Sequence, residues 1–261
     1  MFGKPRLVDK HTEAWVFDRF EWILDTFSRQ KTTYATDLVL PNAQFFPGNN
    51  LSGEEKAIYI CRAVARLCHL SDWPIRLENR SRNQPTQLST FVILQPNDAT
   101  ENETFDEASE GLITLIYDPD SLSRPVELIS GLVHQLSWHL LGTAEWPEEF
   151  TADEEGMLCD LTGIYLGFGV FHANAAFEYS ATADFERQGW SSQRQGFLSE
   201  TSMVFATAIF LRLSGTSEAD ALKHLKPHLS KQLRKALKQV DASPEQLNRL
   251  RSAEPPRLEL V

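Results

Sequence analysis

The sequence predicts an α+β fold in which a small, mainly antiparallel sheet lies in the first half and helices fill the second half. Three short runs have the residue pattern of strands, at residues 75–78, 88–95 and 112–117. After residue 120 the apolar residues recur at three- and four-residue spacing, which is typical of helices. Strands and helices are therefore segregated along the chain, and this pattern favours α+β over alternating βαβ units.

The first half contains, in order, a helix, an extended piece, a second helix and the three strands. Residues 12–28 place apolar side chains on one helical face. Residues 37–41 are extended, and residues 52–55 (Ser-Gly-Glu-Glu) form a capping-box pattern that opens a helix ending near Leu70. The polar run 96–111 predicts a long, mobile loop.

The second half predicts a series of helices. Either Ser121 or Ser123 caps the first of them, which runs to about Leu141. The others cover a segment through Asp160 and Leu166, then residues 199–213, 218–223 and 227–240. We expect one domain over residues 1–240, built from parts 12–118, 121–170 and 199–240, followed by a short helix and a poorly ordered tail over 241–261.

Composition excludes several classes of partner. The net charge of -11 opposes binding to nucleic acid and to anionic membrane surfaces. The longest apolar run, residues 161–171, is too short to span a bilayer and predicts a buried helix. Three cysteines without regular spacing, Cys61, Cys68 and Cys159, favour a reducing cytoplasm over a disulfide framework.

Residues 134–138, His-Gln-Leu-Ser-Trp, carry the outline of a zinc-peptidase signature. That chemistry needs two histidines at i and i+4, which share one face of a helix and bind one metal ion. A glutamate directly after the first histidine then activates the metal-bound water as a general base. A third ligand comes from a following helix, in the pattern Glu-x-x-x-Asp.

Most of these positions are changed in this chain. His134 occupies the first-ligand position, whereas Gln135 replaces the general base with a neutral amide. Trp138 occupies the second-ligand position, and its indole has no lone pair for a metal ion. Gly156 stands four residues before Asp160, where the third ligand belongs. The pattern predicts no catalytic residue and no metal ligand.

A rearranged zinc site is the alternative, with ligands drawn from His134, His139, Glu155 and Asp160. His139 lies about 140° around the helix from His134, so these two imidazoles do not readily share a metal ion. The simpler interpretation is that His134 packs beside Trp138. A pocket is then expected, filled by Trp138 and lined by residues of both helices. Its candidates are His134, Gln135, Trp138, Glu155 and Asp160.

The chain resembles an uncharacterised bacterial family built on a gluzincin-like, HExxH-containing domain. The match runs through most of the sequence, roughly residues 12–240. They include residues 37–41, 45–47, 133–137, 160–161, 166–171, 173–175, 189–192, 196–200 and 224–227. The resemblance implies a zincin-like fold, and this chain is then a degenerate member.

These observations predict a catalytically inactive, metallopeptidase-like protein that binds or regulates a protein or peptide partner. The first alternative is a zinc-dependent hydrolase with rearranged ligands. The second is an interaction module that uses the acidic run Glu145, Glu148, Glu149, Asp153, Glu154 and Glu155, although such runs are usually solvated surfaces. The locally basic stretch 231–238 is typical of nucleic-acid contacts, but the net charge opposes that function.

Overall fold

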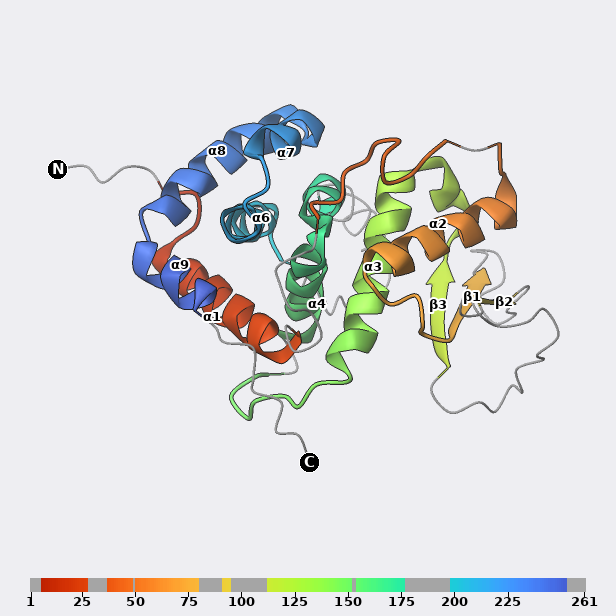
Figure 1. Ribbon diagram of the computed structural model, residues 1–261, viewed down its shortest axis with the longest axis horizontal. Coiled ribbons are helices and arrows are strands. Elements are labelled where there is room, and N and C mark those ends of the chain that lie inside the picture. The colour runs from red at the N-terminus through yellow and green to blue at the C-terminus, as the bar shows by residue number, and fades with distance from the viewer. Residues whose placement is uncertain are drawn as a thin grey trace, which may run out of the picture. The chain divides into compact units, whose positions relative to one another are not determined.

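The structure is a computed structural model that describes residues 6–27, 37–48, 50–79, 91–94, 112–151, 154–176 and 198–252 (Figure 1). The chain divides into two compact units. We call Pro41–Leu140 the sheet unit, and Met1–Leu40 together with Leu141–Val261 the helical unit. The two ends of the chain therefore build one unit, and its middle builds the other. The single domain expected over residues 1–240 is described below as these two units.

The sheet unit contains a mixed sheet, so the expectation of a mainly antiparallel sheet is wrong. Its strands are β1 (Ile75–Asn79), β2 (Phe91–Leu94) and β3 (Ile113–Tyr117), in the order β2-β1-β3. β1 pairs antiparallel with β2, and parallel with β3. The parallel pair arises because the long connection after β2 carries the chain to the opposite edge of β1, which no strand-length pattern reveals.

Helix α2 (Gly53–Leu67) confirms the second predicted helix, although its start differs in detail. Its buried side chains, among them Ile60 and Val64, repeat at four-residue spacing. Ser52 is the N-cap residue, but its side chain makes no capping hydrogen bond, so the capping box is wrong. The next turn is tied down by Lys56, whose Nζ donates to the Leu122 carbonyl at 3.0 Å.

Helix α3 (Pro125–Leu141) carries the signature residues. A short 3-10 helix, η2 (Pro119–Ser123), precedes it, and its cap is the Asp118 carboxylate, which accepts from the Asp120 amide. The predicted caps at Ser121 and Ser123 are therefore wrong. α3 instead begins at Pro125, whose fixed φ and missing N–H suit the first helical turn.

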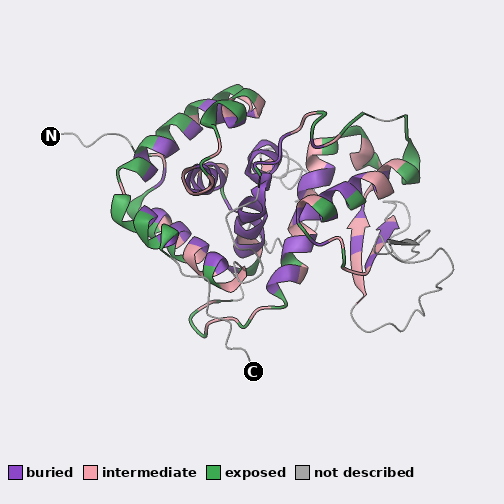
Figure 2. Ribbon diagram, viewed as in Figure 1, coloured by how far each residue is buried: buried purple, intermediate pink, exposed green. Residues whose placement is uncertain are grey.

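The helical unit surrounds α6 (Glu200–Ser214), whose residues 202–211 are all buried. Packed against α6 are α1 (Lys10–Phe27), α4 (Glu155–Gly163), α8 (Pro227–Asp241) and α9 (Pro244–Arg251) (Figure 1). The short helix α7 (Glu218–His224) packs on α8. In Figure 2, α4 and α6 are largely buried, whereas α1, α8 and α9 each keep an exposed outer side.

α4 continues through a π-helical segment, η4 (Ile164–Phe168), and remains helical to Ala176. Gly167 within η4 has φ 94°, a left-handed conformation that glycine adopts without a side-chain clash. Its carbonyl accepts from the Val39 amide at 3.0 Å. In the described part of the chain, Glu155–Ala176 is the helix with the length and hydropathy of a membrane span. Of its most apolar window, 89% is buried, and a core helix has the same properties.

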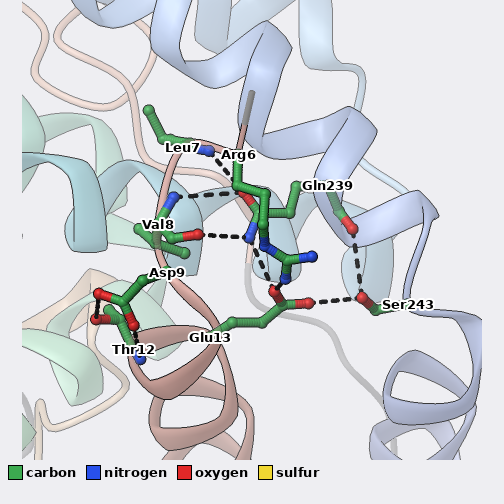
Figure 3. Close-up of polar contacts among 8 residues, drawn as sticks. All are labelled: Arg6, Leu7, Val8, Asp9, Thr12, Glu13, Gln239 and Ser243. Carbon is green, nitrogen blue, oxygen red and sulfur yellow. Dashed lines mark hydrogen bonds and ion pairs between the residues drawn. The ribbon is translucent and has the colours of Figure 1, made fainter. Parts of the chain in front are cut away.

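The two ends of the chain meet in a polar cluster shown in Figure 3. Gln239 of α8 accepts from the Leu7 amide at 2.8 Å and donates to the Val8 carbonyl at 3.0 Å. It also donates to Glu13, which pairs with Arg6. The short helix expected after residue 240 is present as α9, which packs against α1, α6 and α8. The tail after Ser252 lies outside the described residues, as does the predicted loop 96–111.

Candidate functional site

Helix α3 presents His134, Gln135, Trp138 and His139, which the sequence singled out. His134, Gln135 and His139 are half-buried. Trp138 is 50% exposed, and its ring lies edge-on to that of His139 with 4.9 Å between centroids. Trp138 therefore does not fill a pocket, and that expectation is wrong.

The side-chain amide of Gln135 is bonded to the backbone of strand β3. Its Nε2 donates to the Ile116 carbonyl at 2.9 Å, and its Oε1 accepts from the Ile116 amide at 2.7 Å. The same Nε2 also donates to the Gly131 carbonyl, one turn earlier in α3, at 3.2 Å. Both polar atoms of Gln135 are thus committed to the backbone.

Gln135 bonds to the edge of β3 that β1 leaves open. The Ile113 amide donates to the Pro74 carbonyl on the β1 side, and backbone groups alternate in direction along a strand. Thr114 and Ile116 therefore point to the opposite edge. The backbone N–H and carbonyl groups at this edge need other hydrogen-bond partners when a helix covers them, because an unpaired buried amide or carbonyl costs free energy of folding.

His139 reaches the same edge one helical turn further along α3. Its ring is hydrogen-bonded to the backbone of Thr114. Four residues of helix rise by about 6 Å, and two residues of strand by about 6.6 Å. The pair Gln135 and His139 therefore matches Ile116 and Thr114 in spacing. We call these two side chains the edge clamp.

Burial lowers the pKa of His139 below its ordinary value, against the opposing effect of the hydrogen bond to Thr114. The imidazole is therefore neutral near pH 7. A neutral ring can bind a metal ion through one nitrogen only, because the other carries the proton. In this structure the ring is already engaged with β3 as part of the edge clamp.

The remaining predicted residues belong to the helical unit, on α4. Asp160 is buried, and its Oδ2 accepts from the Leu198 amide at 2.9 Å. Gly156 is half-buried and Glu155 is exposed. Neighbouring Cys159 is buried, which raises the pKa of its thiol and keeps it protonated. The structure thus gives Asp160 a role in holding the chain that leads into α6.

Glu154, which the sequence reading passed over in favour of Glu155, is a second buried carboxylate of this region, in addition to Asp160. Its Oε1 accepts from Trp15 Nε1 at 2.5 Å and from Arg19 Nη2 at 3.0 Å. Its Oε2 accepts from the Thr151 amide at 3.0 Å. Burial raises the pKa of Glu154, but these hydrogen bonds and the Arg19 charge outweigh it, and the pKa lies below its ordinary value.

The acidic run is a docked part of the helical unit and not a free linker. Trp146 and Phe150 pack edge-on against Trp22 of α1, with 6.2 and 5.0 Å between ring centroids. Arg19 stacks on Phe150 at 3.9 Å from the ring centroid. Glu154 faces inward and is unavailable to a partner, whereas the remaining described acids are exposed: Glu145, Glu148, Glu149 and Glu155. Asp153 lies outside the described residues.

Two segments named in the resemblance lie together. The side chain of Asn174 donates to the His224 carbonyl at 2.9 Å and accepts from the Lys226 amide at 3.0 Å. Asn174 therefore closes the turn between α7 and α8. Its position after an apolar run gave no sign of this partner, because the two segments are 50 residues apart.

The candidate metal ligands are divided between the units: His134 and His139 on α3, Glu155 and Asp160 on α4. Among the residues that the structure describes, no group of three or more histidine, cysteine, aspartate or glutamate side chains is placed to hold a metal ion. The edge clamp is the arrangement that the sequence reading missed. The four-residue spacing of Gln135 and His139 beside a predicted strand was its available signal.

Comparison with known proteins adds no relative: no family model, curated protein or solved structure matches this chain. The gluzincin-like relation therefore remains a prediction from the sequence segments.

Proposed function

We propose that this chain is a non-catalytic protein with a binding or regulatory role toward a protein or peptide partner. One observation carries the proposal: the side chain at the general-base position, Gln135, is bonded through both of its polar atoms to the backbone of Ile116 and Gly131. At the position where a peptidase needs a group for proton transfer, this chain has a side chain that is hydrogen-bonded to strand β3.

The chemistry of an amide supports this assignment. A general base must take a proton from water in the course of the reaction, and a neutral amide has no group of suitable pKa. Gln135 would also have to leave Ile116, and this would leave a strand-edge amide and carbonyl without partners. Trp138 adds to the argument, because an indole nitrogen donates hydrogen bonds and does not ligate metal.

Metal analysis and peptide hydrolysis test the proposal. The full chain is produced in zinc-supplemented medium, its zinc content is measured by plasma mass spectrometry, and a mixed peptide library is incubated with and without a chelator. We expect zinc well below one equivalent per chain and no chelator-sensitive cleavage. A His134→Ala variant serves as control and should match the parent protein in both measurements.

The opposite result would identify a hydrolase with rearranged ligands. Stoichiometric zinc that is lost in the His134→Ala variant, together with cleavage that chelators abolish, would overturn the non-catalytic assignment.

A further inference from the structure

Helix α8 exposes a row of four basic side chains on one face: Lys231, Arg234, Lys235 and Lys238. Their spacing of three, four and seven residues from Lys231 keeps all four within an arc of about 100° around the helix. The opposite face is buried against α6 and α9, through Leu229, Leu233, Leu237 and Val240. We call these four residues the basic face of α8. α8 lies at the outside of the helical unit (Figure 2).

Within the described part of the chain, none of the four basic side chains forms an ion pair. Two acidic side chains that contact α8 or belong to it, Glu200 and Asp241, bind other residues. Asp241, at the end of α8, uses both carboxylate oxygens on Arg212, at 2.6 and 2.9 Å. Glu200 binds Gln232 at 2.7 Å and His228 at 3.1 Å. Among the described residues, the basic face therefore has no acidic partner, although the net charge of the chain is -11.

The stability of α8 does not account for this charge pattern. Positive charge is favourable near the C-terminus of a helix and unfavourable near its N-terminus. Lys238 in the last turn fits that rule. At the other end, however, Lys226 is the N-cap residue and the first turn holds no acid. α8 thus carries cations along its whole length without the acidic first turn that would stabilise it.

We propose that the basic face of α8 binds an acidic segment of a partner protein. Carboxylates spaced three or four residues apart on a helix match the spacing of these cations. The basic face spans about 10 Å along the helix. Duplex nucleic acid presents a charge every ~1.7 Å over a much longer surface, so most of it would face a protein that is acidic overall. A membrane is disfavoured because the apolar side of α8 is already buried.

The test measures binding of a labelled oligoglutamate peptide of about 15 residues to the full chain by fluorescence anisotropy. Affinity is compared at about 10 and 150 mM salt, where the Debye length falls from ~30 to ~8 Å. The basic-face variant is Arg234→Gln/Lys235→Gln/Lys238→Gln. The control variant is Lys10→Gln/Arg62→Gln/Arg66→Gln, which removes the same charge from exposed residues elsewhere.

We expect the basic-face variant to lose at least tenfold in affinity at low salt, and the control variant to lose less than twofold. Circular dichroism establishes that both variants remain helical. Equal losses in the two variants, or no binding by the parent protein, would overturn the proposal. So would tighter binding of a single-stranded oligonucleotide, or of phosphatidylserine-containing vesicles, that is abolished by the basic-face variant. This test is independent of α3, so its failure leaves the non-catalytic assignment standing.

Discussion

A glutamine side chain ends in the same group as the peptide bond, with one carbonyl oxygen and one amide nitrogen side by side. Two of the glutamines that the structure describes use this likeness. Gln135 bonds to both the N–H and the carbonyl of Ile116, and Gln239 bonds to the backbone of Leu7 and Val8. In each case the side-chain amide takes the place of a backbone peptide group as hydrogen-bond partner. The amide, and not merely a polar group of that size, is what these positions require.

The first prediction replaces Gln135 by glutamate. A carboxylate can still accept from the Ile116 amide, but it cannot donate to the carbonyls of Ile116 and Gly131. We expect Gln135→Glu to lower the free energy of unfolding by about 1–3 kcal/mol near pH 7. Urea denaturation measures this change.

The loss in the Gln135→Glu variant should depend on pH. Nearby carbonyl oxygens disfavour the charged form, so the folded-state pKa of the new carboxyl group is raised above its unfolded value. Stability is then highest below the unfolded pKa and is lost as pH rises from there through the folded pKa, so the deficit should shrink on acidification. A deficit that is absent, or independent of pH, would contradict the edge clamp.

Single contacts of this kind could not be predicted from the sequence. The residues of the signature were identified, and so was the loss of its base and second ligand. Which atom Gln135 contacts depends on how α3 docks on β3, and periodicity does not encode docking. Glu154 and Glu155 are equally acidic and adjacent; only the start of α4 at Glu155 decides that Glu154 turns inward toward Arg19.

At the scale of elements, the helix that follows η4 packs closely against α6 at Gly169. A Cβ added to Gly169 would lie 3.0 Å from Thr207 Cγ2 and closer still to its Oγ1. Thr207 cannot easily move, because it is buried and its Oγ1 donates to the Met203 carbonyl at 2.8 Å. The two helices pack as closely as they do because position 169 has no side chain.

Gly169→Ala is therefore expected to lower the free energy of unfolding by about 1–3 kcal/mol, despite the helix propensity of alanine, which is better by ~1 kcal/mol. In a Thr207→Ala background the same substitution should cost clearly less, because the contacts with Oγ1 and Cγ2 are gone and only the Cβ of residue 207, 3.1 Å away, remains. Thermal or urea unfolding of the parent protein, the two single variants and the double variant gives the coupling free energy between positions 169 and 207. Gly48→Ala is the control, since an added Cβ there meets no atom within 4 Å. Equal effects with and without Thr207 would contradict this packing.

Elements with strong periodicity were predictable, and their exceptions have physical causes. The helix predicted over residues 12–28 is confirmed as α1, and those near 199–213, 218–223 and 227–240 as α6, α7 and α8. The parallel pairing of β1 with β3 was missed, because strand direction depends on the path of the connection. The π-helical segment was missed because the left-handed Gly167 adds no irregularity to the apolar pattern.

At the scale of the whole molecule, contacts between distant parts of the chain close the helical unit. Glu154 joins the turn before α4 to Trp15 and Arg19 of α1 across more than 130 positions. Because the pKa of Glu154 is lowered in the folded protein, the stabilisation from these contacts depends on pH. A carboxylate with a lowered folded-state pKa stabilises the fold above its unfolded pKa, and the stabilisation is lost as pH falls through the folded value.

We expect Glu154→Gln to lower the free energy of unfolding by about 1–3 kcal/mol near pH 7, because the charged hydrogen bonds to Arg19 and Trp15 are lost. The difference from the parent protein should shrink as pH falls below the ordinary glutamate pKa of 4.5. Urea titrations at a series of pH values measure it. Glu149→Gln, at an exposed position, should change stability little at any pH. A constant difference for Glu154→Gln down to low pH would contradict the ion pair.

The discontinuous helical unit has a consequence for synthesis. Glu13 at the start of the chain finds its partner Gln239 only 226 residues later. At roughly 5–20 residues per second, the ribosome needs about 11–45 s to make that stretch. During this interval Phe17, Phe20 and Leu24, all buried in the finished protein, have no α6 or α9 to cover them. The apolar face of α1 is thus exposed to solvent until the last helices emerge.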